Sequence, residues 1–373
     1  MFGQIPFKVI LLYMLYATGA TTAAIACSYL LLRRSNAFAP DVTSPVRLRR
    51  WTAAFFASLA LGHVWYMPTV VCTSDDTIML GNLVGGLLDC MIAIPLAMVV
   101  LLCLLQDRRR PLWLAWAMAA PLVAGMVVSI INRNYDLFPA MHIYLLLLGI
   151  GLVIYMVHAV RQYGHWLRDN YADLEHKEVW QSFVVLAVIL LVFGIYVYGF
   201  GWPAYEYIIQ VCGIVFICYL LWRVETLSDL SISQPLFLSV EKERITTEEM
   251  EDDSLSEVSL DDIGPLLQQC CIDTQLYLQH DLTITQLAKA IGSNRTYLSQ
   301  YFAHLDTTYN AYINNLRINH FVHLYREAIA AQRPVLAKQL ANDSGYRSYS
   351  TFSLAFKQRM GQSVTAWMHD SAE

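Results

Sequence analysis

Four polar side chains near the C-terminal end of the chain share one face of a predicted helix. They are Arg295, Thr296, Ser299 and Gln300. Leu298 and Phe302, one helical turn apart, form the opposite apolar face. Arginine and short hydroxyl or amide side chains can hydrogen-bond to base edges in the major groove of DNA, which is wide enough for an α-helix. The four residues are therefore candidates for reading DNA bases.

A preceding helix and a sharp turn must position this reading helix. Thr283 and Gln286 have the spacing of a capping box, which predicts a helix that starts just before Ile284. Apolar residues then repeat at helical spacing as far as Ile291, and Gly292 supplies the turn. The order of these elements predicts a helix-turn-helix unit.

The same order recurs about fifty residues later. Pro334 suits a first helical position, and Gly345 marks the second turn. Residues 348–360 then form the second predicted reading helix, with Phe352 and Phe356 as its buried pair. The base-reading candidates on this helix are Tyr349 and Ser350.

A single helix is predicted between the two units, over residues 310–331. Two reading helices held by a rigid connector could occupy successive major-groove turns, roughly 34 Å apart. Basic residues around them are candidates for contacts to phosphates, which position a protein without reading bases. These candidates are Arg317, Arg347 and Lys357.

In this order, the motifs resemble the tandem helix-turn-helix domain of AraC/XylS-type bacterial transcription regulators. The resemblance covers residues 282–360, about a quarter of the chain. It rests on Leu287-Ala288, the run from Asn294 to Ser299 (NRTYLS), the run from Tyr312 to Arg317 (YINNLR), Ser344-Gly-Tyr346, and the run from Phe352 to Lys357 (FSLAFK) followed by Gly361. It implies an all-α domain that binds double-stranded promoter DNA, with RNA polymerase as a further partner.

The chain departs from the family pattern at three positions. Val364 stands where the family usually has proline, and Phe321 where a small residue is more usual. Leu354 replaces a common arginine on the second reading helix, although it could still touch a thymine methyl group. The first unit, with Arg295, is therefore better equipped to specify sequence.

Composition places the rest of the chain in a different class. The 373 residues are 56% hydrophobic and only 15% charged, outside the range of an ordinary soluble protein. A helix needs roughly 20 apolar residues to cross a bilayer. Seven runs approach that length, at residues 7–32, 51–71, 83–105, 112–131, 141–160, 183–200 and 204–222. The alternative is six spans, if the last two runs form a re-entrant pair.

Loop charges predict the orientation of these spans. Lys and Arg beside spans favour the cytoplasmic side. They gather after the first, third and fifth runs, at Arg33, Arg34, Arg47, Arg49, Arg50, Arg108, Arg109, Arg110, Arg161, Arg168 and Lys177. We expect a multi-pass protein of the bacterial inner membrane, with the N-terminus outside and the C-terminal domain in the cytoplasm.

Ionisable residues inside the runs are candidates for a ligand pocket in the membrane. His63 and Asp89 lie deepest, and Glu206 lies near a span end. They could receive a small-molecule or envelope signal. The alternative is that they form hydrogen bonds between helices that stabilise packing.

An acidic connector joins the two halves. Residues 224–262 hold 12 acidic and 2 basic residues, which predicts a solvated, flexible tether. The predicted division is therefore a membrane domain at 1–223, a linker at 224–262 and a DNA-binding domain at 263–373. The eight cysteines include no CxxC pair and indicate apolar packing instead of metal binding.

The sequence thus predicts an all-α protein, with a seven-helix transmembrane bundle before a tandem helix-turn-helix domain. We expect a membrane-bound transcription regulator whose membrane domain acts as a sensor or an anchor. We expect no catalytic activity, metal or cofactor. Residues 263–373 have nine basic and seven acidic residues, so a homodimer formed through the spans would help binding. The alternative class is a membrane transporter or enzyme that carries a regulatory DNA-binding domain. A sensor kinase is disfavoured because no nucleotide-binding glycine-rich motif occurs.

Overall fold

The fold is known from a computed structural model that describes residues 7–40, 42–67, 72–185, 187–188, 204–230 and 260–371. Within these residues the regular elements are helices, and the only β-pairing is an isolated bridge. The all-α prediction agrees with this. The chain forms two compact units: Met1–Tyr163 with Val179–Ile232, and Gly164–Glu178 with Ser233–Glu373.

The second unit differs from the predicted linear division of the chain. The segment Gly164–Glu178 lies between two predicted spans, yet it belongs to the unit that contains the C-terminal domain. We call this segment the strap. Most of the predicted linker, residues 231–259, lies outside the described residues.

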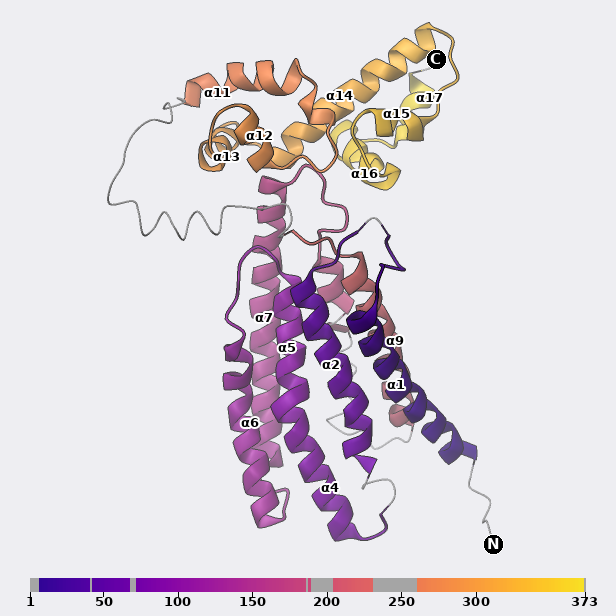
Figure 1. Cartoon of the computed structure of the whole chain (residues 1–373), viewed down its shortest axis with the longest axis vertical. Helices are drawn as coiled ribbons and strands as arrows, with labels where there is room; N and C mark the ends of the chain where they lie inside the picture. The colour runs from indigo at the N-terminus through magenta and orange to yellow at the C-terminus, as the bar shows by residue number, and fades with distance from the viewer. Residues whose placement is uncertain are drawn as a thin grey trace, which may run out of the picture. The chain divides into compact units, whose positions relative to one another are not determined.

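The first unit consists of long helices (Figure 1). Its described elements are α1 (Phe7–Leu32), α2 (Val46–Trp65), α4 (Asp75–Leu88), a π-helical turn (Asp89–Ala93), α5 (Ile94–Leu104), α6 (Trp113–Asn132), α7 (Phe138–Asn170) and α9 (Ala204–Thr226). Helix α1 packs on α2 and α9, α2 packs on α5, and α4 packs on α6. The last residues of α7 form the beginning of the strap.

Five helices in the described residues are long and apolar enough to cross a membrane. They are Ile10–Leu32, Asp75–Leu104, Trp113–Asn132, Phe138–Asn170 and Tyr207–Thr226. The predicted span at 51–71 falls on α2, which is helical but is not one of the five. Most of the predicted span at 183–200 lies outside the described residues. The structure therefore does not confirm a bundle of seven spans.

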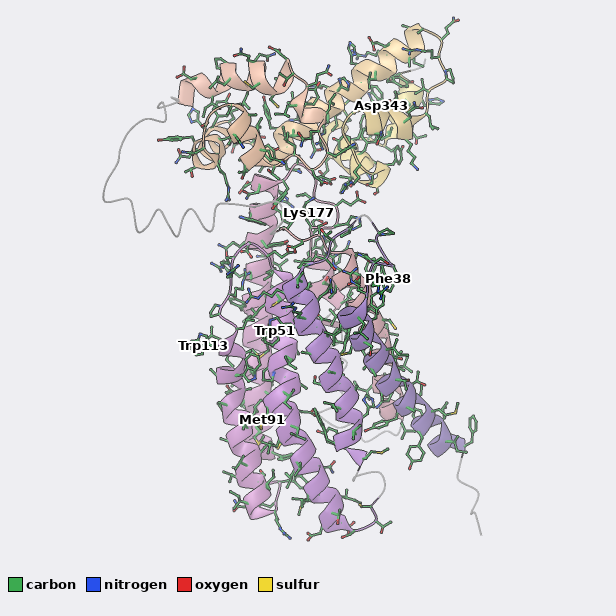
Figure 2. All side chains as sticks on the ribbon, viewed as in Figure 1. Phe38, Trp51, Met91, Trp113, Lys177 and Asp343 are labelled. Carbon is green, nitrogen blue, oxygen red and sulfur yellow. The ribbon has the colours of Figure 1, made fainter. Side chains whose placement is uncertain are left out.

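Large apolar side chains cover the outer surface of these helices (Figure 2). Trp113 at the start of α6 is 66% exposed, and Ile154 on α7 is also 66% exposed. Exposed apolar area on this scale is unusual for a protein surrounded by water. Contact with lipid would remove the cost of that exposure.

Glycines allow two close contacts between helices of this unit. A Cβ atom on Gly85 would overlap the Tyr66 ring, and one on Gly86 would lie 2.7 Å from the Met126 methyl group. Small residues at helix interfaces are typical of membrane bundles, where association depends on close packing.

A buried ion pair joins the ends of α1 and α9. The Arg33 guanidinium lies 3.0 Å from the Glu225 carboxylate. The Asn36 amide donates to the Glu225 carbonyl oxygen, and Gln106, which follows α5, donates to the Ser228 carbonyl oxygen. The residues that follow α1, α5 and α9 therefore meet at one end of this unit.

The second unit carries the tandem helices of the C-terminal domain. After the strap, its elements are α11 (Leu260–Leu267), a π-helical turn (Gln268–Ile272), a 3-10 turn (Leu276–Leu278), α12 (Ile284–Ala290), α13 (Arg295–His304), α14 (Tyr309–Ala330), α15 (Ala337–Asp343), α16 (Tyr349–Met360) and α17 (Val364–Asp370). The long predicted helix at 310–331 is thus confirmed as α14, shifted by one residue at each end.

Helix α14 passes through two separate hydrophobic clusters. Its first half contributes Ile313 to a cluster formed with α11, α12 and α13. Its second half contributes Phe321 and Tyr325 to a cluster formed with α15, α16 and α17. Each reading helix therefore rests on its own core, and α14 sets the spacing between them.

Candidate nucleic-acid interface

Local hydrogen bonds fix the first helix and turn as the sequence predicts. The Gln286 N–H donates to the Thr283 hydroxyl, and the Thr283 N–H donates to the Gln286 side chain, so the capping box is complete. Gly292 has a φ of +69° and supplies the turn before α13.

Helix α13 presents the predicted polar face. The Asn294 side chain caps it by accepting from the Tyr297 N–H at 2.9 Å, and Leu298 and Phe302 are buried. Among the base-reading candidates, Arg295, Thr296 and Gln300 are exposed and Ser299 is half-buried. The helix therefore leaves these four side chains available for contact with DNA.

Helix α16 is the matching element of the second unit. Ser348 caps it by accepting from the Thr351 N–H, and Phe352 and Phe356 are buried as predicted. Ser350 is exposed, whereas Tyr349 is half-buried with its ring 5.8 Å from the Phe352 ring. Lys357 is exposed on the same helix.

The turn before α16 requires glycine. Gly345 has a φ of +87°, and a Cβ atom there would lie 2.7 Å from the Leu278 carbonyl oxygen. The prediction for Pro334 was wrong, because α15 begins at Ala337, after an extended Leu336. Leu340 and Ala341 pack on the second core, so a helix does precede Gly345, but its start was misplaced.

Arg317 was predicted to contact phosphate, and the structure corrects this. Its side chain is 1% exposed. Its Nε donates to the Tyr277 carbonyl oxygen at 2.8 Å, and its Nη2 donates to the Gln279 carbonyl oxygen at 2.7 Å. Burial lowers the pKa of this guanidinium, while nearby Tyr346 and Asp173 favour its charged form. Arg317 therefore holds the loop before α12 against α14.

Arg347 is exposed, but it is paired with a carboxylate. Its Nη1 lies 3.0 Å from Asp281 Oδ2, and Lys177 Nζ lies 3.0 Å from Asp281 Oδ1. Burial alone would raise the pKa of Asp281, but the Lys177 and Arg347 cations hold it below its ordinary value. The predicted phosphate contact of Arg347 would require this pair to open.

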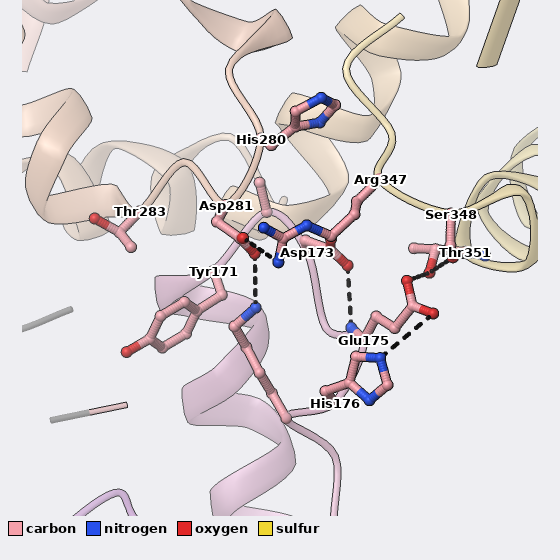
Figure 3. Close-up of polar contacts among 12 residues, drawn as sticks. Tyr171, Asp173, Glu175, His176, His280, Asp281, Thr283, Arg347, Ser348 and Thr351 are labelled. Carbon is pink, nitrogen blue, oxygen red and sulfur yellow. Dashed lines mark hydrogen bonds and ion pairs between the residues drawn. The ribbon is translucent and has the colours of Figure 1, made fainter. Parts of the chain in front are cut away.

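The strap is the part of this site that the sequence analysis missed (Figure 3). Tyr171 forms a β-bridge with Thr283, and the Ala172 N–H donates to the Leu282 carbonyl oxygen. The Glu175 carboxylate accepts a hydrogen bond of 3.1 Å from the Thr351 hydroxyl in the first turn of α16. Residues 164–178 carry four acidic side chains, a signal that was visible in the sequence but was attributed to a loop between spans.

Two of the departures from the family pattern have structural reasons. Phe321 is fully buried, with its ring 4.5 Å from the Phe352 ring and 5.7 Å from the Phe356 ring. Val364 is buried at the first position of α17, directly after the Ser363 cap. Leu354 is 61% exposed on α16 and so is accessible to DNA.

The structure describes the side-chain contacts of two of the three residues proposed for a membrane pocket. His63 Nδ1 lies 2.8 Å from the Leu59 carbonyl oxygen, and its ring packs edge-on against Tyr16. Asp89 accepts a hydrogen bond of 2.7 Å from the Tyr66 hydroxyl. Glu206 lies in α9, but its side chain is outside the described residues. This hydrogen bond joins Asp89 to the residue that directly follows α2.

Comparison with known proteins identifies the class of this domain. Residues 287–370 match the family model of a helix-turn-helix domain, and the matched range contains both α13 and α16. No curated protein and no solved structure matches the chain. Residues 287–370 are therefore a helix-turn-helix domain of the AraC type, which supports a role in DNA binding and transcription regulation.

Proposed function

We propose that the chain is a membrane-anchored, sequence-specific regulator of transcription. In this proposal the apolar helices hold it in the bacterial inner membrane, as sensor or anchor, and the tandem helices bind promoter DNA in the cytoplasm. One observation carries the proposal: a complete pair of capped, exposed reading helices shares a chain with five helices that are long and apolar enough to cross a bilayer.

The proposed orientation is supported by the ends of the first unit. Arg33, which directly follows α1, forms a buried ion pair with Glu225 in the last turn of α9. Arg34, Arg49 and Arg50 lie close to this end in sequence. Basic residues beside spans favour the cytoplasmic side, which is the side where the DNA-binding domain must lie. RNA polymerase, a second copy of the chain and an envelope or small-molecule signal are the partners that this role implies.

DNA binding by the full chain tests the proposal. The chain would be reconstituted in lipid nanodiscs and titrated with DNA from its own upstream region at low salt. We expect saturable binding, which Arg295→Ala weakens for this DNA more than for a scrambled fragment. A missing base contact is expected to cost about 1–3 kcal/mol. Equal loss on both fragments would argue against sequence reading by α13.

Membrane orientation needs a separate measurement. A reporter that is active only in the cytoplasm, fused after Glu373, should give a signal. The opposite result would end the proposal, because a periplasmic domain meets no chromosome.

A second candidate is a transporter or membrane enzyme that carries a DNA-binding domain. One observation favours it: Asp89 lies in a π-helical turn, and such turns are frequent at functional sites. Asp89→Asn separates the two. A transporter would lose substrate flux while keeping promoter occupancy, whereas a sensor would lose the transcriptional response to its signal.

A further inference from the structure

The strap places carboxylates beside both reading helices. Glu175 accepts a hydrogen bond from Thr351 on α16. Burial raises the pKa of Asp169 in the strap, and the His165 and Arg295 side chains, the latter on α13, partly offset this rise. One acidic segment thus meets the two helices that carry the base-reading candidates.

The strap is an integral part of this unit. The Asn310 side-chain amide donates to the carbonyl oxygens of Tyr171 and Ala172. Ala172 is 1% exposed and belongs to the first hydrophobic cluster. Tyr171 and Ala172 therefore anchor the strap to the domain through backbone bonds and apolar burial.

Beyond this anchor, residues 173–177 form a tight acidic tip. The Glu175 N–H donates to Asp173 Oδ1 at 3.0 Å, and the Lys177 N–H donates to the Leu174 carbonyl oxygen at 3.0 Å. These two bonds shape the turn that presents Glu175 to Thr351. Lys177 fastens the other end of the tip to Asp281 (Figure 3).

The tip occupies positions that bound DNA would need. The N-terminus of a helix attracts phosphate through its free N–H groups and its dipole. The Glu175 carboxylate of the strap already lies against Thr351 in the first turn of α16, and it would repel a phosphate. Arg347 is engaged by Asp281, which Lys177 of the tip holds from the other side.

We propose that the tip of the strap is an autoinhibitory contact that covers the start of α16. DNA binds fully only when Glu175 leaves Thr351 and Arg347 leaves Asp281. Any signal that releases the tip from these two contacts would therefore favour DNA binding. This inference rests on the proposed DNA-binding function and names how it is regulated.

The test uses the full chain in nanodiscs and DNA from its own upstream region. Glu175→Gln removes the charge of the tip and keeps its size, and Glu175→Ala removes the acceptor altogether. We expect each to tighten DNA binding roughly tenfold, the scale of one hydrogen bond to a charged group. Glu327→Gln is the matched control, since it removes one negative charge from an exposed site on α14.

Hydrogen exchange provides a second readout that does not depend on affinity. Saturating DNA should increase exchange at residues 173–177 in the wild-type chain and leave Tyr171 and Ala172 protected. The circular dichroism of each variant shows whether its helices are intact.

The possible outcomes separate the two proposals. Tighter binding by both Glu175 variants, with Glu327→Gln unchanged, supports autoinhibition. DNA binding that is equally tight in all variants overturns autoinhibition and leaves the proposed function standing. An equal gain in Glu327→Gln also overturns it, because the effect is then one of net charge. Failure of every variant to bind DNA at low salt overturns both proposals.

Discussion

Arg317 donates hydrogen bonds from one guanidinium to the Tyr277 and Gln279 carbonyl oxygens, and its Cζ atom lies 5.5 Å from the centre of the Tyr346 ring. Tyr277 belongs to the first hydrophobic cluster and Tyr346 to the second. A single side chain on α14 thus joins the supports of both reading helices. The placement of the two reading helices relative to each other therefore depends on this buried cation.

Replacement of Arg317 should therefore loosen the whole domain. Arg317→Lys keeps a charge but cannot reach both carbonyl oxygens from one planar group. We expect the free energy of unfolding to fall by about 1–3 kcal/mol, which is the cost of buried polar groups left without partners. Hydrogen exchange of the α14 amides measures this, with Arg326→Lys, exposed on the same helix, as the control. Unchanged protection in Arg317→Lys would contradict this role.

The cap of α13 should set the stability of its first turn. Asn294→Ala removes the acceptor for the Tyr297 N–H and should cost about 1 kcal/mol. Asn294→Ser keeps a capping oxygen and should retain most of the stability. Exchange of the first-turn amides and DNA affinity should decline together in the alanine variant only. A parallel decline in the serine variant would point to a direct contact between Asn294 and DNA.

Leu354 offers a test by gain of function. It is 61% exposed on α16, where an arginine could reach a base edge or a phosphate. Leu354→Arg should strengthen DNA binding by about 1–3 kcal/mol if it makes a bidentate base contact. Ile329→Arg adds the same charge at an exposed site near the end of α14. Titrations with native and scrambled DNA should show a sequence-dependent gain for Leu354→Arg alone. Equal gains in DNA affinity for both variants would show that the added positive charge, and not a base contact, strengthens binding.

Lys357 should act on phosphate without reading sequence. Lys357→Gln is expected to weaken binding to all DNA fragments alike. It should also reduce the slope of log affinity against log salt by about 0.9, the value for one phosphate contact. Arg326→Gln removes a charge at an exposed site on α14 and should leave the slope unchanged. A slope that stays constant in Lys357→Gln would place Lys357 away from the DNA.

The Asp281 ion pairs predict a response to acid. Because the folded pKa of Asp281 lies below its ordinary value, its stabilising effect is complete above a pH of about 4, the pKa of an unfolded aspartate. The effect is lost as the pH falls through the lower folded pKa. Asp281→Asn should reproduce this loss at pH 7 and increase hydrogen exchange at residues 173–177.

A matched control exists for this substitution. Asp281 has a φ of +54° and Asp306 a φ of +51°, and asparagine tolerates both. Asp306→Asn, at an exposed turn, should leave exchange of the strap unchanged. A rise in both variants would assign the effect to the backbone instead of the ion pairs.

Much of the DNA-binding domain could be predicted from its sequence because its signals are local. The Thr283 cap, the turn at Gly292 and the apolar pair Phe352 and Phe356 each act within a few residues. Capping, positive φ and helical periodicity are short-range effects. They were enough to locate α12, α13, α14 and α16. They misplaced the start of α15 at Pro334, and α11 and α17 were not predicted.

Tertiary structure alone decided which polar side chains are exposed and so available for contact with DNA. Arg317 and Lys357 are both basic residues on predicted helices, yet Arg317 is buried against loop carbonyl oxygens and Lys357 is exposed. The partners of Arg347 and Thr351 lie 66 and 176 residues away in sequence, at Asp281 and Glu175. Periodicity carries no information on contacts at such separations, because they form only when distant segments pack together. The sequence by itself determined the reading helices, and the fold determined that a strap from between two predicted spans contacts the start of α16.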